Sequence, residues 1–338
     1  MAPPYGFSPP GAVSLRGMAN GVPGLEAVEE LAEVVRSGFV ESRHFGLAVA
    51  LDPDGKQVFG AGEVDAVVLP RSTAKPLQAV GCIVAGADLS DEEAAIAAGS
   101  HTGENRHVAL VDGILGSVGL DREALGCPPD RPEDEATRFR LIAEGVGPEK
   151  VRMNCSGKHA AMLKATVARG ADPAAYLTPD SPVQQILTTE IERLTEATTG
   201  IVAIDGCGAP LLGMPLSGLA RAFSHLATAA PGTADRHVAE AMRRHPELVG
   251  GKGHQNSEVM RLLPGVIAKG GAEGVIAMAT PDGHAVAVKV IDGNPRATTA
   301  LALALLEKCG LDVSAAAELR DIAILGGGKP VGEIRSML

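Results

Sequence analysis

Two stretches toward opposite ends of the chain show the pattern of apolar positions expected for β-hairpins. Residues 44–51 form a largely apolar run, and residues 57–60 follow it after the letters DPDG, which have the composition of a tight turn. Residues 274–279 and 285–291 repeat this arrangement around the letters PDG. The pattern therefore predicts two hairpins separated by more than two hundred residues.

The chain between these hairpins mostly carries apolar residues at helical spacing. The clearest helices are predicted at residues 76–85, 106–118, 158–169, 182–197, 218–229 and 234–244. A further helix is predicted at about 295–308 and a short strand near 322–325. Ahead of the first hairpin, residues 24–37 also show apolar residues at helical spacing, so a helix is expected there, on Leu25, Val28, Leu31, Val34 and Val35.

This order of elements predicts an α/β (α+β) fold. A mixed, mainly antiparallel sheet is expected to assemble from both ends of the chain, with the helices as a second lobe and a cleft between them. Residues 1–22 are rich in Pro and Gly and are expected to form a flexible tail. Residues 23–338 are expected to form one domain, with a sheet lobe at about 40–70 and 265–338 and a helical lobe at about 76–262.

Composition removes several classes of function. Lys and Arg total 30 against 41 Asp and Glu, and this formal charge of −11 disfavours nucleic acids and anionic membranes as partners. The chain has no Trp and few other aromatic residues, which argues against platforms that stack bases. Its N-terminus lacks the apolar core of a signal peptide, and its five scattered cysteines are odd in number. We expect a cytoplasmic protein with reduced thiols.

The first candidate for chemistry is a serine followed by a lysine at the start of a predicted helix. Ser72 and Lys75 share one helical face, so the amine can reach the hydroxyl. A serine hydroxyl needs a base before it can act as a nucleophile, and a lysine serves when burial and neighbouring cations lower its pKa. Taken alone, the pair also fits a helix cap followed by a surface lysine.

Two further residues strengthen this interpretation. Ser100 lies in a polar loop after an alanine-rich helix, and Lys269 precedes two glycines and a predicted strand. A serine–lysine pair, then a loop serine, then a lysine beside a strand is the order found in penicillin-recognising serine enzymes. The sequence therefore favours a serine acyl-transfer enzyme, in which the second serine–lysine pair relays a proton to the leaving group.

Cys155 and Cys207 lie in two glycine-containing turns and leave three interpretations open. They are simply buried small residues, or they hold zinc together with a third donor. Alternatively, Cys155 acts as a nucleophile with His159, helped by the dipole of the helix that begins beside it. Ser72 competes for the same role.

Five ordered motifs make the chain resemble a known family. These are RSTAKP at 71–76, SHTGE at 100–104, NCSGKH at 154–159, DGCGAP at 205–210 and VGEIR at 331–335. They resemble the rhizobial-type (class 3) L-asparaginases of the asparaginase II family, and the resemblance runs from about Val40 to Arg335. It implies a fold like that of serine β-lactamases and glutaminases, a homodimer, and hydrolysis of L-asparagine to L-aspartate and ammonia.

The resemblance also implies site residues. It implies two tandem pairs, Ser72–Lys75 and Ser100–Lys269, and a zinc ion held by Cys155, Lys158 and Cys207. Lysine is an unusual ligand, because it must lose its proton before it can donate a lone pair to the metal. Substrate contacts around residues 250–256 could not be assigned.

These observations give one mechanistic hypothesis for a catalytic domain at residues 23–338. Lys75 takes the proton of Ser72 as its hydroxyl attacks the side-chain amide, and Ser100, tuned by Lys269, protonates the departing ammonia. Arg71 and Asp205 are expected to bind the α-carboxylate and α-ammonium groups. The remaining residues that we expect to contact substrate are Asn154 and His159.

Three alternatives stay open at this stage. Ser100 could be the nucleophile instead of Ser72. A glutaminase or a β-lactamase-like hydrolase would use the same serine–lysine machinery. A non-catalytic zinc-binding protein would keep Cys155 and Cys207 but would tolerate loss of Ser72.

Overall fold

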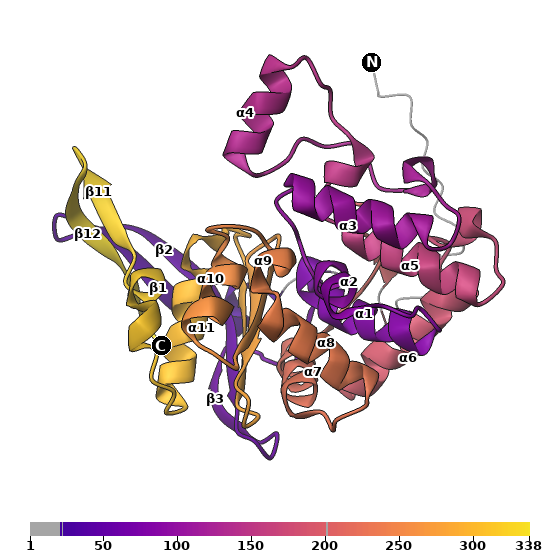
Figure 1. The fold of residues 1–338 in the computed structure, drawn as a ribbon. Coiled ribbons are helices and arrows are strands. Elements are labelled where there is room, and N and C mark those ends of the chain that lie inside the picture. Colours follow the sequence, from indigo (N-terminus) through magenta and orange to yellow (C-terminus); the bar gives the residue numbers. More distant parts are fainter. Residues whose placement is uncertain (1–20, 22, 201) are drawn as a thin grey trace, which may run out of the picture.

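A large antiparallel sheet forms one side of the protein in the computed structural model, which describes residues 21, 23–200 and 202–338 (Figure 1). The strand order is β11-β12-β1-β2-β10-β9-β8, and β3 pairs with β2. The strands are β1 (Glu29–Arg36), β2 (Phe39–Leu51), β3 (Gln57–Ala61), β8 (Ile267–Gly271), β9 (Val275–Ala279), β10 (Ala285–Val290), β11 (Ala323–Gly326) and β12 (Lys329–Ser336). The predicted fold class, a mainly antiparallel sheet built from both chain ends plus a helical lobe, is confirmed.

Both predicted hairpins are present. β2 pairs with β3, and β9 pairs with β10, with Met278 opposite Val286. The two hairpins meet in the middle of the sheet, where Ala48 on β2 lies opposite Val288 on β10. All six residues of β10 are buried, because α7 and α11 both pack against this strand.

The prediction of a helix at residues 24–37 is wrong. Only a short 3-10 turn, η1 (Leu25–Ala27), precedes β1, which pairs with β12 on one side and β2 on the other. Five consecutive residues of β1, from Leu31 to Val35, are buried. A strand buried on both faces shows an unbroken apolar run instead of alternation, so its residues also matched helical spacing by chance.

Helices occupy most of the chain between the two hairpins, as expected, together with four short strands. The helices are α1 (Lys75–Val84), α2 (Asp91–Ala97), α3 (Asn105–Gly116), α4 (Glu135–Ala143), α5 (Ser156–Ala168), α6 (Pro182–Thr195), α7 (Leu216–Thr228), α8 (Ala234–Arg244), α9 (Pro246–Val249) and α10 (Gln255–Leu262). The short strands are β4 (Val67–Val68), β5 (Val202–Ile204), β6 (Pro210–Leu212) and β7 (Met214–Pro215) in two small sheets, β4–β7 and β5–β6. Near the C-terminal end, α11 (Thr298–Lys308) and α12 (Ala317–Arg320) complete the fold.

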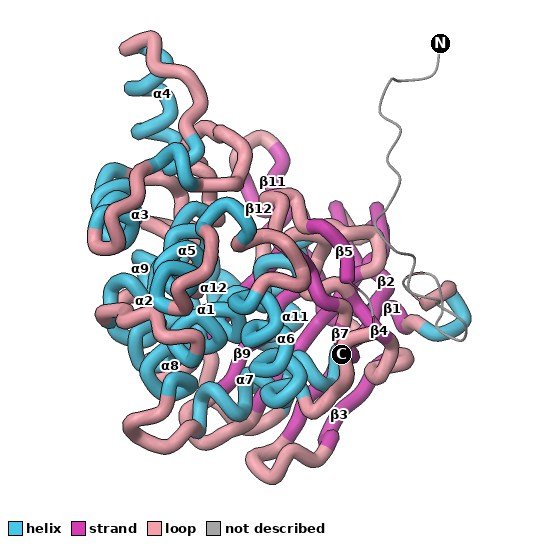
Figure 2. Tube along the Cα trace, turned by 90° about the vertical axis from the view of Figure 1, so that its right-hand side faces the viewer, coloured by secondary structure: helices cyan, strands magenta, loops and turns pink. Residues whose placement is uncertain are grey.

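The helices gather beside the large sheet, as Figure 2 shows from a second direction. In Figure 1, α4 and the β11–β12 hairpin extend away from the main body. The predicted flexible tail at residues 1–22 falls almost entirely outside the described residues. Among the helices of the described residues, none has the length and apolar character needed to cross a membrane.

Candidate functional site

Ser72 is placed by a strained turn at the start of α1. It belongs to the 3-10 turn η2 (Arg71–Ala74), and Arg71 has a φ of 51°, a left-handed conformation that costs a non-glycine residue free energy. The Arg71 side chain is held by Asp205, with Nε 2.8 Å from Oδ1. The turn also lies close to β8, since a Cβ added at Gly271 would lie 3.0 Å from the Ser72 nitrogen.

Ser100 lies between two lysine side chains. Lys75 Nζ donates a hydrogen bond to Ser100 Oγ at 2.9 Å, and Lys269 Nζ lies 2.9 Å from the same oxygen. Lys75 also donates to the backbone oxygen of Asn154, at 3.2 Å. The expected Ser100–Lys269 contact is therefore present, whereas Lys75 reaches Ser100 and not Ser72. The two expected serine–lysine pairs share Ser100.

Both lysines lie entirely inside the protein, each with 0% exposure. Burial, followed by the nearby Lys75 charge, lowers the pKa of Lys269 well below its ordinary value. A neutral amine has a lone pair, so Lys269 can accept the hydroxyl proton of Ser100. Two adjacent buried cations would repel each other strongly, which is the physical reason that one of them stays neutral.

Both serines line one cavity of about 570 Å³. Its walls come from η2, the loop before α4, the start of α10 and the end of β8. Asn154 lines it, as expected for a substrate contact. Three residues that the sequence did not single out also line it: Glu133, His254 and Asn256. Glu133 Oε1 accepts a hydrogen bond from Asn154 Nδ2 at 2.7 Å.

The residues of the expected metal site come together beside the lysines. Lys158 Nζ donates to Cys207 Sγ at 3.2 Å, and Cys155 Sγ donates to Asn154 Oδ1 at 3.1 Å. The interaction between the two thiols, more than any other cause, lowers the pKa of Cys155 and raises the pKa of Cys207. Burial opposes the charged form of Lys158, but Cys207, Cys155 and Asp205 together raise its pKa.

The donor chemistry of this cluster fits zinc. Two sulfur atoms and one amine nitrogen suit the ion, and a fourth position would remain for water or substrate. Within the described residues, no group of three His, Cys, Asp or Glu side chains could hold a metal, so Lys158 is needed as the third donor. Metal binding would have to remove the Lys158 proton, because without zinc the amine serves as a hydrogen-bond donor to Cys207.

Three other residues that we expected to bind substrate do not line this cavity. Among the described residues, those that line the serine cavity do not include Arg71, Asp205 or His159. His159 is completely buried, and its Nδ1 lies 2.6 Å from Tyr176 Oη. Burial lowers the pKa of His159 well below its ordinary value. The structure therefore does not bring His159 to the serines, nor does it pair Cys155 with His159.

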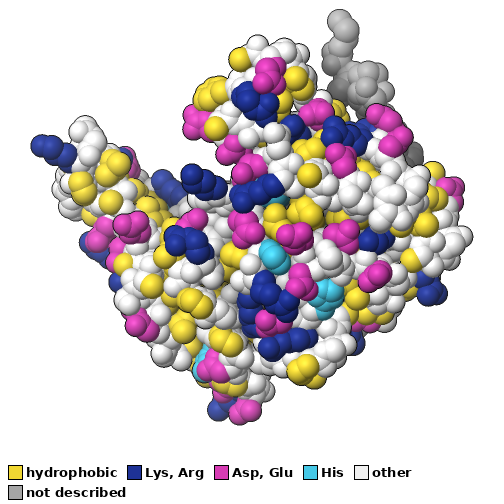
Figure 3. Space-filling model, in the orientation of Figure 1, with side chains coloured by type: hydrophobic (Ala, Val, Ile, Leu, Met, Phe, Trp, Pro, Cys, Tyr) yellow, Lys and Arg dark blue, Asp and Glu magenta, His cyan; other side chains and the backbone are white. Residues whose placement is uncertain are grey.

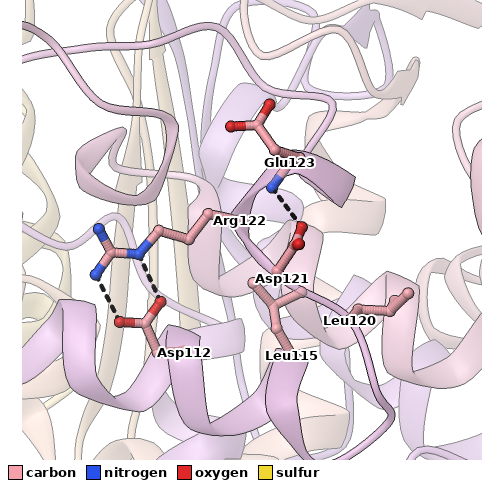
Figure 4. Close-up of a pocket in the computed structure, with 6 residues that line it drawn as sticks. All are labelled: Asp112, Leu115, Leu120, Asp121, Arg122 and Glu123. Carbon is pink, nitrogen blue, oxygen red and sulfur yellow. Dashed lines mark hydrogen bonds and ion pairs between the residues drawn. The ribbon is translucent and has the colours of Figure 1, made fainter.

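A separate cavity of about 460 Å³ lies beside α3 (Figure 4). Arg122 forms two hydrogen bonds with the Asp112 carboxylate there, at 2.8 and 2.7 Å. The charged groups that line this cavity thus largely satisfy one another. Its lining residues include no pair of a nucleophile and a base. Figure 3 shows basic and acidic side chains interspersed over the face seen in Figure 1, with no broad surface of one sign.

Comparison with known proteins gives one family. The sequence matches L-asparaginase II over residues 32–336, which is nearly all of the described chain. A search of curated proteins found no significant relative.

Solved structures with a related arrangement include hydrolases. A β-lactamase from Mycobacterium bovis is 15% identical with a TM-score of 0.45, and the alignment covers 79% of this chain and 95% of that one. The native form of Mglu is 14% identical with a TM-score of 0.47, covering 85% and 70%. A putative β-lactamase from Bacteroides dorei is 15% identical with a TM-score of 0.43, covering 78% and 93%. Resemblances this distant carry no argument about function.

Proposed function

Since this chain belongs to the L-asparaginase II family, which makes it a hydrolase of the asparaginase type, we propose that it converts L-asparagine and water into L-aspartate and ammonia. The reaction proceeds through a serine acyl-enzyme. The observation that carries this proposal is the position of Ser100, whose Oγ lies 2.9 Å from both lysine amines in a cavity that Ser72 also lines.

In the proposed mechanism, Ser72 attacks the side-chain amide of asparagine. Lys75 first passes its own proton through Ser100 to the neutral Lys269, and its Nζ then turns from Ser100 toward Ser72 to accept the Ser72 proton. The proton then passes through Ser100, which contacts both amines, to the departing ammonia. Water attacks the resulting ester by the same route in reverse and releases aspartate.

A second assignment of the nucleophile uses the contacts without rearrangement. Ser100 attacks the amide, and Lys269 accepts its proton across the 2.9 Å contact. The lowered pKa of Lys269 supports this route, because a general base must be neutral before it can act. The two routes predict acylation of different serines.

A further question is which amide this hydrolase prefers. Glutamine is longer than asparagine by one methylene, which typically separates two substrates by only about 1–3 kcal/mol. A glutaminase or a β-lactamase-like hydrolase therefore remains the alternative. Arg71 and Asp205 stay our prediction for the two charged groups of the substrate. Arg71 and Asp205 already form a hydrogen bond with each other. The zwitterionic substrate would therefore have to insert between these two side chains.

We also propose that Cys155, Lys158 and Cys207 hold zinc. Its positive charge beside the cavity would help to orient the substrate. Metal analysis of protein purified without chelators tests this, and a zinc content that disappears in Cys207→Ser supports it. A non-catalytic zinc-binding protein would show the same metal content but no ammonia release.

The deciding experiment measures ammonia release from L-asparagine and L-glutamine and ring opening of a chromogenic β-lactam, with wild type and Ser72→Ala side by side. Hydrolysis of L-asparagine as the preferred substrate supports the proposal. Preference for glutamine or the β-lactam moves the chain to the alternative, and inactivity on all three favours the zinc-binding protein. A homodimer and a cytoplasmic location, in accord with five free cysteines, remain predictions.

A further inference from the structure

Asn256 carries a buried amide nitrogen that is not used by the protein. The residue lies in the first turn of α10 and is only 3% exposed. In the described part of the chain, its Nδ2 has no hydrogen-bond partner. Leaving a buried donor unsatisfied costs about 1–3 kcal/mol, and such groups are rare in native proteins. The cost suggests that another molecule supplies the missing acceptor.

The orientation of the Asn256 amide follows from the hydrogen bond that its oxygen accepts. Asn256 Oδ1 accepts a hydrogen bond from the backbone nitrogen of Gly270 at 2.8 Å. A backbone N–H can only donate, so the amide oxygen must face Gly270 and the Nδ2 group must occupy the opposite position. Rotating the amide would lose this bond and would set two donors against each other.

The surroundings of Asn256 favour an anionic group. Asn256 lines the same cavity as Ser72 and Ser100. It lies at the N-terminal end of α10, where the helix dipole is positive. Burial, followed by the charges of Lys269 and Lys75, lowers the pKa of the adjacent His254 to about 4, so its ring is neutral near pH 7. The start of α10 and the buried Lys75 create a positive potential without an exposed cation.

The ring of His254 supplies a further donor. His254 Nδ1 accepts a hydrogen bond from the Asn256 backbone nitrogen at 3.2 Å. A neutral imidazole that accepts through Nδ1 carries its proton on Nε2. The start of α10 therefore offers uncharged donors beside the two serines.

We propose that Asn256 Nδ2 donates a hydrogen bond to the α-carboxylate of the substrate. This role makes Asn256 a specificity-determining residue that selects small amides with a free carboxylate. The inference rests on the proposed amidohydrolase function and adds Asn256 to Arg71 as a donor to the same carboxylate.

The test uses two substitutions and an isosteric pair of substrates. Asn256→Ala removes both ends of the amide, whereas Asn256→Asp keeps an acceptor for Gly270 and removes only the donor. L-Asparaginamide differs from L-asparagine only in a carboxamide that replaces the α-carboxylate. Asn105→Ala, on α3 and outside the cavity, is the control, because its side-chain oxygen accepts from Arg152 and Arg140.

We expect the KM for L-asparagine to rise by about tenfold or more in both Asn256 variants, since hydrogen bonds to charged groups are among the stronger ones. The KM for L-asparaginamide should stay within about twofold, and Asn256→Asp should keep a near-normal kcat. A purely structural role would instead lower kcat for both substrates, and Asn256→Asp would restore it.

Binding of L-aspartate, measured by calorimetry, separates this inference from the proposed function. Wild type should bind L-aspartate, and Asn256→Ala should bind it about tenfold or more weakly. Equal affinity in the two proteins, or no binding by wild type, overturns the inference. Wild-type inactivity on every amide would overturn the proposed function alone, because the binding measurement does not require turnover.

Discussion

Ser100 links two lysines that cannot both carry a charge at low cost. Each amine is fully buried, and each lies 2.9 Å from the same hydroxyl oxygen. Interacting buried groups titrate as a pair, so removing one lysine changes the proton affinity of the other. A proton shared in this way can move over a short distance without entering water.

Lys269 should make stability depend on pH in a defined direction. Its folded-state pKa lies below the unfolded value of about 10.4, so the unfolded chain binds the extra proton between these two pKa values. Wild type should therefore gain stability relative to Lys269→Met as pH rises toward about 10.4. Urea unfolding of both proteins from pH 6 to 10 measures this difference.

The same ionisation predicts the lower limit of activity. As pH falls through the lowered pKa of Lys269, the amine gains a proton and can no longer act as a base. Activity should therefore fall as the pH falls through this pKa. The surface variant Lys252→Met should follow the wild-type curve in both experiments. A Lys269→Met protein whose stability parallels wild type at every pH would contradict the assignment.

Acylation should distinguish the two serines. Ser72→Ala should lose at least about a thousandfold in turnover and form no covalent adduct with a slow amide substrate. Ser100→Ala should still acylate, but slowly and with equally slow release of ammonia, because ammonia departs as the acyl-enzyme forms and the proton relay is gone. Mass spectrometry of the quenched enzyme detects the adduct. Ser117→Ala, on the far side of α3, serves as the control.

An adduct that persists in Ser72→Ala and disappears in Ser100→Ala would transfer the nucleophile to Ser100. In that outcome the 2.9 Å contact with Lys269 is the functional pair. The fold should be intact in both variants, which thermal unfolding verifies.

The sequence predicted which residues gather at the candidate site better than it predicted their contacts. The spacing of Ser72 and Lys75 correctly indicated neighbouring positions, but a lysine side chain is long enough to reach past Ser72 to Ser100. Glu133 and Asn256 were missed for different reasons. A charge run on a loop normally faces solvent, and an asparagine in a glycine-rich stretch carries no periodic signal. Only the folded chain brings these residues to one cavity.

At the scale of elements, the contact between α2 and α5 depends on Gly157. A Cβ at this position would lie only 2.6 Å from the backbone oxygen of Ile96. Gly157→Ala should therefore push the two helices apart and lower the free energy of unfolding by about 1–3 kcal/mol. Because Gly157 lies between Cys155 and Lys158, bound zinc should fall as well. Urea unfolding and metal analysis measure the two effects.

Gly113→Ala is the matched control for that substitution. Gly113 also lies within a helix, α3, but a Cβ there would meet no atom within 4 Å. Removing its backbone freedom in the unfolded state should stabilise the protein by about 0.4–1 kcal/mol. If both alanine variants change stability in the same direction, helical propensity and not helix contact governs Gly157.

Element boundaries were predictable where turns or helical periodicity were strong. α8 occupies the same residues as predicted, and most of the other helices end within two or three residues of their expected positions. The prediction for β1 was wrong because its pairing with β12 joins opposite ends of the chain, which no local pattern contains. β12 was missed because its pairing with β1 is equally non-local, with Ala32 opposite Ser336.

At the scale of the whole molecule, the predicted homodimer can be examined directly. Light scattering after size-exclusion chromatography should give about twice the chain mass of 34.4 kDa. A monomer that retains full activity would show that the site is complete within one chain.

The large sheet is built from both ends of the chain, so the chain can be cut into two pieces that each contribute strands to it. A cut within residues 197–200, after α6, would leave Ser72 and Ser100 with β1–β3 in one piece. The other piece would hold Lys269 with β8–β12. Because β1 pairs with β12 and β2 pairs with β10, the pieces share one hydrogen-bonded ladder. Neither piece alone holds a complete set of proton-transfer groups, so ammonia release would become a reporter of their reassociation, as in a split enzyme.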